Sequence, residues 1–162
     1  MYSFFSGFIA SPSKIRTFLE CPRKYWYTYI NPETKGISPE KSYFTLGHHV
    51  HAALRDFFGI SSSSRTEEKL LQLLEQKWQT KNGRAGGFAT LEIELEAKNR
   101  AISILKLFLK TENWKTTPVY LPEKTGGKIP GYKFVPIDKE LAFGGIIDRM
   151  DMDEDGILNI ID

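Results

Sequence analysis

The last eighteen residues constrain the fold of this chain most, because two β-type segments there flank an acidic turn. Residues 145–151 (GIIDRMD) and 157–162 (ILNIID) are rich in isoleucine, and residues 153–156 (DEDG) are typical of a turn. A hairpin formed in this way places Asp148 and Asp162 on adjacent antiparallel strands. Two carboxylates in that arrangement can point at one divalent cation.

The acidic residues of this segment also fit a calcium-binding site. The spacing of Asp151, Asp153 and Asp162 matches a calcium-binding EF-hand loop, with Asp in place of the usual bidentate Glu at the last position. An EF-hand needs an amphipathic helix on each side, whereas residues 143–150 contain two glycines and two β-branched residues, which disfavour a helix. The sequence therefore favours the hairpin, and a calcium-binding protein using residues 151–162 is an alternative.

Helical periodicity dominates the chain between about residues 11 and 112. Apolar residues recur at a helical spacing over residues 44–58 and 90–110. Ser13 is predicted to cap a shorter helix near the N-terminus, and Ser64 begins a capping box, SRTE, ahead of another helix.

Short β-type segments bounded by proline follow the helices, at residues 117–122 and 132–137. This order predicts a mixed α+β fold (α/β in the broad sense), with N-terminal helices followed by an antiparallel β-meander over about 115–162. We expect residues 1–162 to belong to one domain.

Composition argues against several classes of protein. No apolar run reaches the roughly 18 residues that a membrane-spanning helix needs, so no membrane association is expected. The apolar N-terminal stretch lacks the preceding basic residues of a signal peptide. The single cysteine, Cys21, cannot form an internal disulfide, which agrees with a reducing compartment. A cytoplasmic location is therefore expected.

Charge is distributed unevenly along the chain. Residues 1–147 contain 21 Lys and Arg against 14 Asp and Glu, whereas residues 148–162 contain one basic and six acidic residues. A mildly basic body with an acidic cluster suits a protein that attracts phosphates and holds a cation. A solvated surface explains the same numbers, so charge alone does not choose between the two.

Three histidines fall on the predicted helix over residues 44–58. His51 lies at the border of its apolar face, whereas His48 and His49 are expected at the surface. A histidine at such a border is either a packed residue or a ligand. The acidic residues downstream favour the ligand.

Four motifs in a fixed order resemble those of the PD-(D/E)XK nuclease superfamily. They are residues 11–25, which contain SPS and CPRKY, residues 46–54 (LGHHVHAAL), residues 145–149 (GIIDR) and residues 160–162 (IID). Within the superfamily they look like the RecB/AddB-type exonuclease domain. The resemblance implies an incomplete restriction-endonuclease-like core and a Mg²⁺- or Mn²⁺-dependent deoxyribonuclease of DNA repair or recombination. Its substrate would be DNA, and its partner a helicase or recombination protein.

The resemblance also implies roles for individual residues. His51, Asp148 and Asp162 would bind the metal, and the two aspartates would be catalytic. The lysine of the family motif is expected two positions after Asp162. Residues 1–162 would then be the N-terminal part of one nuclease domain, able to bind metal with little or no turnover. A non-catalytic nucleic-acid-binding module is the alternative.

In this branch a lone cysteine ahead of the PRKY run joins three later cysteines around a [4Fe–4S] cluster. Cys21 is therefore either a cluster ligand in a longer protein or a small buried hydrophobic residue.

Several basic and aromatic residues are candidates for binding nucleic acid. Arg23, Lys24 and Tyr25 could contact phosphates and stack on bases, or Tyr25 could pack within its helix. Arg149 would either contact a phosphate or pair with Asp151, and the sequence leaves both open.

Overall fold

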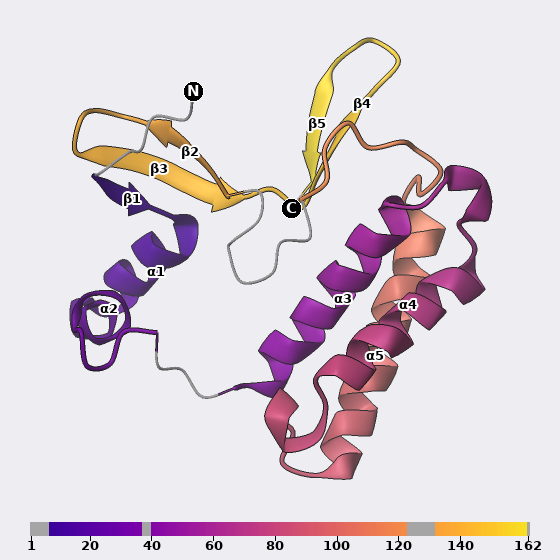
Figure 1. Cartoon of the computed structure of the whole chain (residues 1–162), viewed down its shortest axis with the longest axis horizontal. Helices are drawn as coiled ribbons and strands as arrows, with labels where there is room; N and C mark the ends of the chain where they lie inside the picture. Colours follow the sequence, from indigo (N-terminus) through magenta and orange to yellow (C-terminus); the bar gives the residue numbers. More distant parts are fainter. Residues whose placement is uncertain (1–6, 37–39, 123–131, 162) are drawn as a thin grey trace. The chain divides into compact units, whose positions relative to one another are not determined.

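The computed structural model describes residues 7–36, 40–122 and 132–161. The chain divides into two compact units (Figure 1). The first unit comprises Met1–Ser38 and Glu123–Ile147, and the second unit comprises Pro39–Pro122 and Asp148–Asp162.

Short helices form the N-terminal part of the first unit. Helix α1 (Pro12–Glu20) begins after Ser11, whose Oγ accepts a hydrogen bond from the backbone N–H of Lys14. Pro12 suits the first helical position, because its ring fixes a helical φ and its missing N–H would have no partner within the helix. The cap is therefore Ser11, and the prediction of Ser13 is wrong. Helix α2 (Pro22–Tyr25) follows and continues as a π-helix, η1 (Trp26–Ile30).

A three-stranded sheet completes the first unit. Its central strand β3 (Leu141–Ile146) pairs antiparallel with β2 (Tyr132–Pro136) and parallel with β1 (Phe8–Ala10). Ala142 in β3 pairs with Ile9 and is fully buried. Strand β2 lies where a strand is predicted. Strand β1 has no counterpart among the predicted strands, because three residues are too few to show an alternating pattern.

Three longer helices pack side by side in the second unit (Figure 1). They are α3 (Ser42–Phe58), α4 (Glu67–Thr80) and α5 (Leu91–Thr111). Their apolar faces share one core, whose fully buried side chains include Phe57, Leu70, Leu74, Phe88 and Leu105. Burying a side chain of this size contributes about 1.5–3 kcal/mol relative to exposure. The core therefore makes the helices a stable support for the residues on α3.

Threonine side chains cap both α4 and α5. Thr66 and Thr90 each accept a hydrogen bond from the backbone N–H three residues later. The helix predicted over residues 90–110 is confirmed. The predicted capping box at Ser64 does not form, because Ser62–Ser64 is a 3₁₀ turn, η2, and the helix begins after Thr66.

A 3₁₀ turn, η3 (Gly83–Gly86), joins α4 to α5 and ends at a position that requires glycine. Gly87 has a φ of +78°, and a Cβ built there would lie 2.6 Å from the carbonyl oxygen of Glu40. Any other residue would be strained by both its backbone conformation and this contact. The turn therefore approaches the segment before α3 closely.

The acidic C-terminal segment forms the predicted hairpin. Strand β4 (Arg149–Met152) pairs antiparallel with β5 (Leu158–Ile161), and Met150 also bridges to Tyr120. Gly156, with a φ of +78°, permits the turn between the strands. Strands rather than helices enter and leave the acidic loop, so the EF-hand alternative lacks its helix–loop–helix frame.

The predicted mixed α+β fold is confirmed, since helices precede most of the strands. The strands differ from one continuous antiparallel meander in three respects. The strand predicted over residues 117–122 is reduced to an isolated bridge at Tyr120, and β3 also pairs in parallel with β1. Strands β3 and β4 belong to different sheets and different units, with the division between Ile147 and Asp148. Within the described ranges, every helix is too short or too polar to cross a lipid bilayer.

Candidate metal-binding site

His51 and Asp148 come together in the second unit. The Nδ1 atom of His51 lies 2.8 Å from Oδ2 of Asp148. His51 lies in the middle of α3. Asp148 is predicted on a strand, but it occupies a bend directly before β4, because the pairing with β5 begins at Arg149. The two residues are far apart in sequence, so the packing of the hairpin against α3 brings them together.

The periodicity of α3 explains why His51 is available at the surface. The helix buries Val50, Ala53 and Phe57 in the core and leaves the His51 side chain 60% exposed. The Asp148 side chain is 34% exposed. Both donor groups are therefore accessible to a ligand from solvent.

The pair suits a hard divalent cation in type and spacing. Carboxylate oxygen and imidazole nitrogen both ligate such ions. Adjacent ligands of an octahedral ion, each about 2.1 Å from it, lie roughly 3.0 Å apart, which is close to the separation found here. In the described part of the chain, no group of three or more His, Cys, Asp or Glu is placed to hold an ion. Asp162, the third predicted ligand, lies outside the described residues.

Arg149, the residue after Asp148, is buried. Its side chain is 8% exposed, and its Nη2 lies 3.0 Å from Oδ2 of Asp151. The guanidinium carbon lies 4.1 Å from the centre of the Phe58 ring, at the end of α3. Of the two partners considered for Arg149, the structure shows Asp151.

Arg65 contacts the same aromatic ring from another part of the unit. Its guanidinium carbon lies 4.9 Å from the centre of the Phe58 ring. It donates hydrogen bonds to the backbone carbonyls of residues 58, 60, 114 and 116. Burial lowers the pKa of Arg65, the charge of Arg149 lowers it further, and the Asp151 carboxylate opposes this. Neither Phe58 nor Arg65 is singled out in the sequence, although Phe58 follows His51 by two helical turns.

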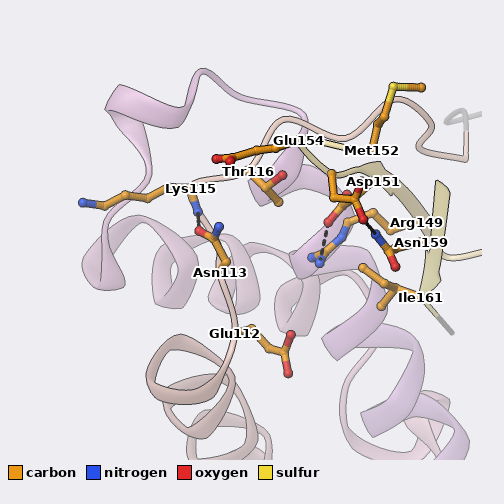
Figure 2. Close-up of a pocket in the computed structure, with 11 residues that line it drawn as sticks. Glu112, Asn113, Lys115, Thr116, Arg149, Asp151, Met152, Glu154, Asn159 and Ile161 are labelled. Atoms are coloured by element: carbon orange, nitrogen blue, oxygen red, sulfur yellow. Dashed lines mark hydrogen bonds and ion pairs between the residues drawn. The ribbon is translucent and has the colours of Figure 1, made fainter. Parts of the chain in front are cut away.

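A cavity of about 510 Å³ lies beside Arg149 and Asp151 (Figure 2). Its other lining residues include Glu112, Lys115 and Glu154. Within the part of the chain that the structure describes, neither His51 nor Asp148 lines it. The cavity is therefore distinct from the His51–Asp148 pair.

The other two histidines of α3 differ from each other. His49 is buried, its Nε2 lies 2.8 Å from the carbonyl oxygen of Lys81, and its ring packs against Trp78. The prediction of a surface position is therefore wrong for His49, because the helix turns this residue toward α4. His48 is exposed, as expected. Partial desolvation lowers its pKa, and electrostatic interactions with His49, Lys81 and Arg55 lower it further.

Cys21 lies in the first unit and is exposed. Its Sγ accepts a hydrogen bond from the backbone N–H of Lys24 at 3.4 Å and caps α2. The expectation of a small buried hydrophobic residue is therefore wrong. Cys21 is the linking residue between the end of α1 and the start of α2, and its side chain faces solvent. Its role as a cluster ligand stays a prediction.

The predicted nucleic-acid contacts beside Cys21 also lie in the first unit. The Arg23 guanidinium carbon is 5.9 Å from the centre of the Tyr27 ring, and Lys24 forms an ion pair with Glu20 at 3.1 Å. Tyr25 is partly buried among neighbouring rings. Binding of nucleic acid by these residues stays a prediction.

Comparison with known families agrees with the motifs. The model of the PD-(D/E)XK nuclease superfamily matches residues 9–162. The chain belongs to the PD-(D/E)XK nuclease superfamily. Nucleases of this superfamily are hydrolases that typically use divalent metals such as Mg²⁺, and membership implies DNA as the substrate. No curated protein and no solved structure matches the chain.

Proposed function

We propose that this PD-(D/E)XK nuclease is a Mg²⁺- or Mn²⁺-dependent deoxyribonuclease of the RecB/AddB exonuclease type. It would act in DNA repair or recombination, in the cytoplasm, together with a helicase or recombination protein. The observation that supports metal-dependent cleavage most is the 2.8 Å separation between His51 and Asp148. Two residues from separate family motifs meet there at a separation close to that of adjacent metal ligands.

The chain's own residues would hold the ion and leave room for the substrate. Asp148 supplies negative charge, the imidazole of His51 supplies a neutral nitrogen, and Asp162 is proposed as the third ligand. A divalent ion bound there would neutralise the charge that develops on the scissile phosphate and would favour ionisation of a water. The exposure of the His51 and Asp148 side chains allows a phosphate to approach.

Residues outside the His51–Asp148 pair would contribute as well. The family motif also contains a lysine two positions after its acidic residue, which we propose is Asp162. Cys21 would ligate a [4Fe–4S] cluster in a protein with three further cysteines. Arg23, Lys24 and Tyr25 would contact DNA in the first unit.

A metal titration tests the proposed ligands directly. Mn²⁺ binding to the 162-residue chain, followed by the electron paramagnetic resonance of free Mn²⁺, is expected to weaken at least about tenfold in Asp148→Asn and in His51→Gln. Glu154→Gln removes one exposed acidic charge from the hairpin turn and serves as the matched control. Equal affinity in Asp148→Asn and Glu154→Gln would contradict the site.

Cleavage is tested in a chain that continues through the motif lysine. We expect Mg²⁺- or Mn²⁺-dependent degradation of DNA that Asp148→Ala abolishes, and activity surviving this change refutes the assignment. Binding of DNA without metal-dependent cleavage would favour the non-catalytic module. Tight Ca²⁺ binding lost in Asp153→Ala but kept in Asp148→Ala would favour the calcium-binding alternative.

A further inference from the structure

The start of β4 contacts α3 at two positions on one helix face. Asp148 meets His51, and the next residue, Arg149, meets Phe58. His51 and Phe58 are seven residues apart, which places them within about 20° of each other around the helix and roughly 10.5 Å apart along it. Two consecutive residues therefore contact the same helix face about two turns apart.

From this geometry we propose that Arg149 is a positioning residue for the metal ligand Asp148. The inference rests on the proposed metal-binding function of Asp148. Arg149, Asp151 and Phe58 together form what we call the Arg149 anchor. The anchor fixes the backbone next to Asp148, so that the Asp148 carboxylate is held opposite His51 before any ion binds.

The side chain of Arg149 makes two contacts. Its Nη2 and the Asp151 Oδ2 are 3.0 Å apart, and the two side chains are only 8% and 12% exposed. Its guanidinium lies over the Phe58 ring at 4.1 Å from the ring centre. A planar guanidinium can stack on a ring and pair with a carboxylate at once, which the compact ammonium group of lysine does less well. The anchor is therefore specific for arginine.

The ring that receives Arg149 is itself fixed. Phe58 is 5% exposed, and Arg65 contacts its ring as well. Arg65 binds backbone carbonyls at the end of α3 and at residues 114 and 116. The Phe58 ring is thus a rigid partner, because its movement would disturb the packing around these hydrogen bonds.

The surroundings of Arg149 favour positioning over binding of a phosphate. The Asp151 carboxylate already neutralises much of its charge. The adjoining cavity is also lined by acidic residues, among them Glu112 and Glu154, whose charges would repel a phosphate. In metal sites, residues that orient a ligand typically change metal affinity 10–100-fold when they are replaced.

Three variants of the 162-residue chain test the proposal. Arg149→Lys keeps the charge and Phe58→Leu keeps an apolar side chain, but both remove the stacked guanidinium–ring contact. Lys98→Ala breaks a partly exposed ion pair with Glu75 between α5 and α4 and is the control for general effects on the unit. The readouts are Mn²⁺ affinity by electron paramagnetic resonance and, without metal, the backbone amide order parameter of Asp148 by ¹⁵N relaxation. Circular dichroism verifies that each variant is folded.

We expect Arg149→Lys and Phe58→Leu to weaken Mn²⁺ binding about tenfold and to lower the order parameter of Asp148, whereas Lys98→Ala changes neither. A folded Arg149→Lys or Phe58→Leu with wild-type affinity and an unchanged order parameter would overturn the proposal, even if its Tm fell. Absence of Mn²⁺ binding by the wild-type chain would refute the proposed metal site. The metal-free order parameters would then still decide whether Arg149 fixes Asp148.

Discussion

The two ends of the β4–β5 hairpin use aspartate in different ways. At the turn, Oδ1 of Asp153 accepts hydrogen bonds from the backbone N–H groups of Asp155 and Ile157. Its Oδ2 accepts another from the side chain of Asn159. At the open end, Asp148 pairs with His51 from α3, a separate element of the fold. The Asp153 carboxylate therefore stabilises its own turn, whereas the Asp148 carboxylate connects the hairpin to α3.

This difference shows how a structural acid and a candidate ligand can be distinguished. The acidic loop matches a metal-binding spacing in sequence, yet the carboxylate of Asp153 is occupied by the turn. Asp148 lies outside the acidic turn in sequence, yet its carboxylate faces a nitrogen donor. The partner contributed by a distant element, rather than the local density of acids, marks the candidate site. Four predictions test this comparison.

The largest effect is expected from breaking the Arg149 anchor near the open end. Asp151→Ala leaves the buried Arg149 charge without its carboxylate, which costs about 3–5 kcal/mol when such a pair loses one partner. Urea unfolding measures the change in the free energy of unfolding. The exposed Glu154→Ala should stay within about 0.5 kcal/mol. A loss below 1 kcal/mol in Asp151→Ala would mean that the anchor does not stabilise the hairpin.

Exchanging the two aspartates for alanine should give opposite patterns. Asp148→Ala is expected to weaken Mn²⁺ binding at least about tenfold, with a stability change within about 0.5 kcal/mol, because the side chain is partly exposed. Asp153→Ala is expected to lower stability by about 1–2 kcal/mol through its lost hydrogen bonds and to leave Mn²⁺ binding within about twofold. Calorimetric titration and urea unfolding measure the two quantities. If Asp148→Ala and Asp153→Ala changed Mn²⁺ affinity and stability alike, the two ends of the hairpin would not differ in function.

A backbone change at the turn should act on stability alone. Gly156→Ala places a Cβ at a φ of +78°, which costs about 1 kcal/mol. Thermal unfolding should show a lower Tm, while Mn²⁺ affinity stays unchanged. A weakened affinity would show that the turn and the open end are coupled through the strands.

The smallest effect concerns the pH dependence of stability that His48 contributes. The pKa of His48 is lowered in the folded chain, so the unfolded chain binds the proton more readily. Stability should therefore fall as the pH decreases through the ordinary histidine pKa of about 6.5. The contribution should stay below about 0.5 kcal/mol, because solvent screens the exposed ring. His48→Gln should flatten the dependence of stability on pH between about 7 and 5, and an unchanged slope would contradict the shift.

Much of the helical architecture follows from local sequence. Apolar spacing predicts α3 and α5, and the turn residues 153–156 predict the hairpin, because these patterns reflect contacts within a few residues. The caps were harder to predict. Ser11 and Ser13 are both plausible capping residues, and only Pro12 at the first helical position favours Ser11.

The contacts around the candidate site depend on distant parts of the chain. The family motifs single out His51 and Asp148, but nothing local shows that Phe58 receives Arg149. The burial of His49 depends on the carbonyl oxygen of Lys81 on another segment. Local periodicity misses such contacts, because it describes the face of an element and not the element that covers it.

The parallel pairing of β1 with β3 has a consequence for how the chain folds as it is made. Ile9 pairs with Ala142, so this contact closes only after translation has passed the helices between them. At about 5–20 residues per second, a ribosome needs roughly 7–27 s to make the intervening segment. The α3–α5 bundle is complete in sequence before that time. The nascent chain could therefore fold its helical core while β1 is still unpaired.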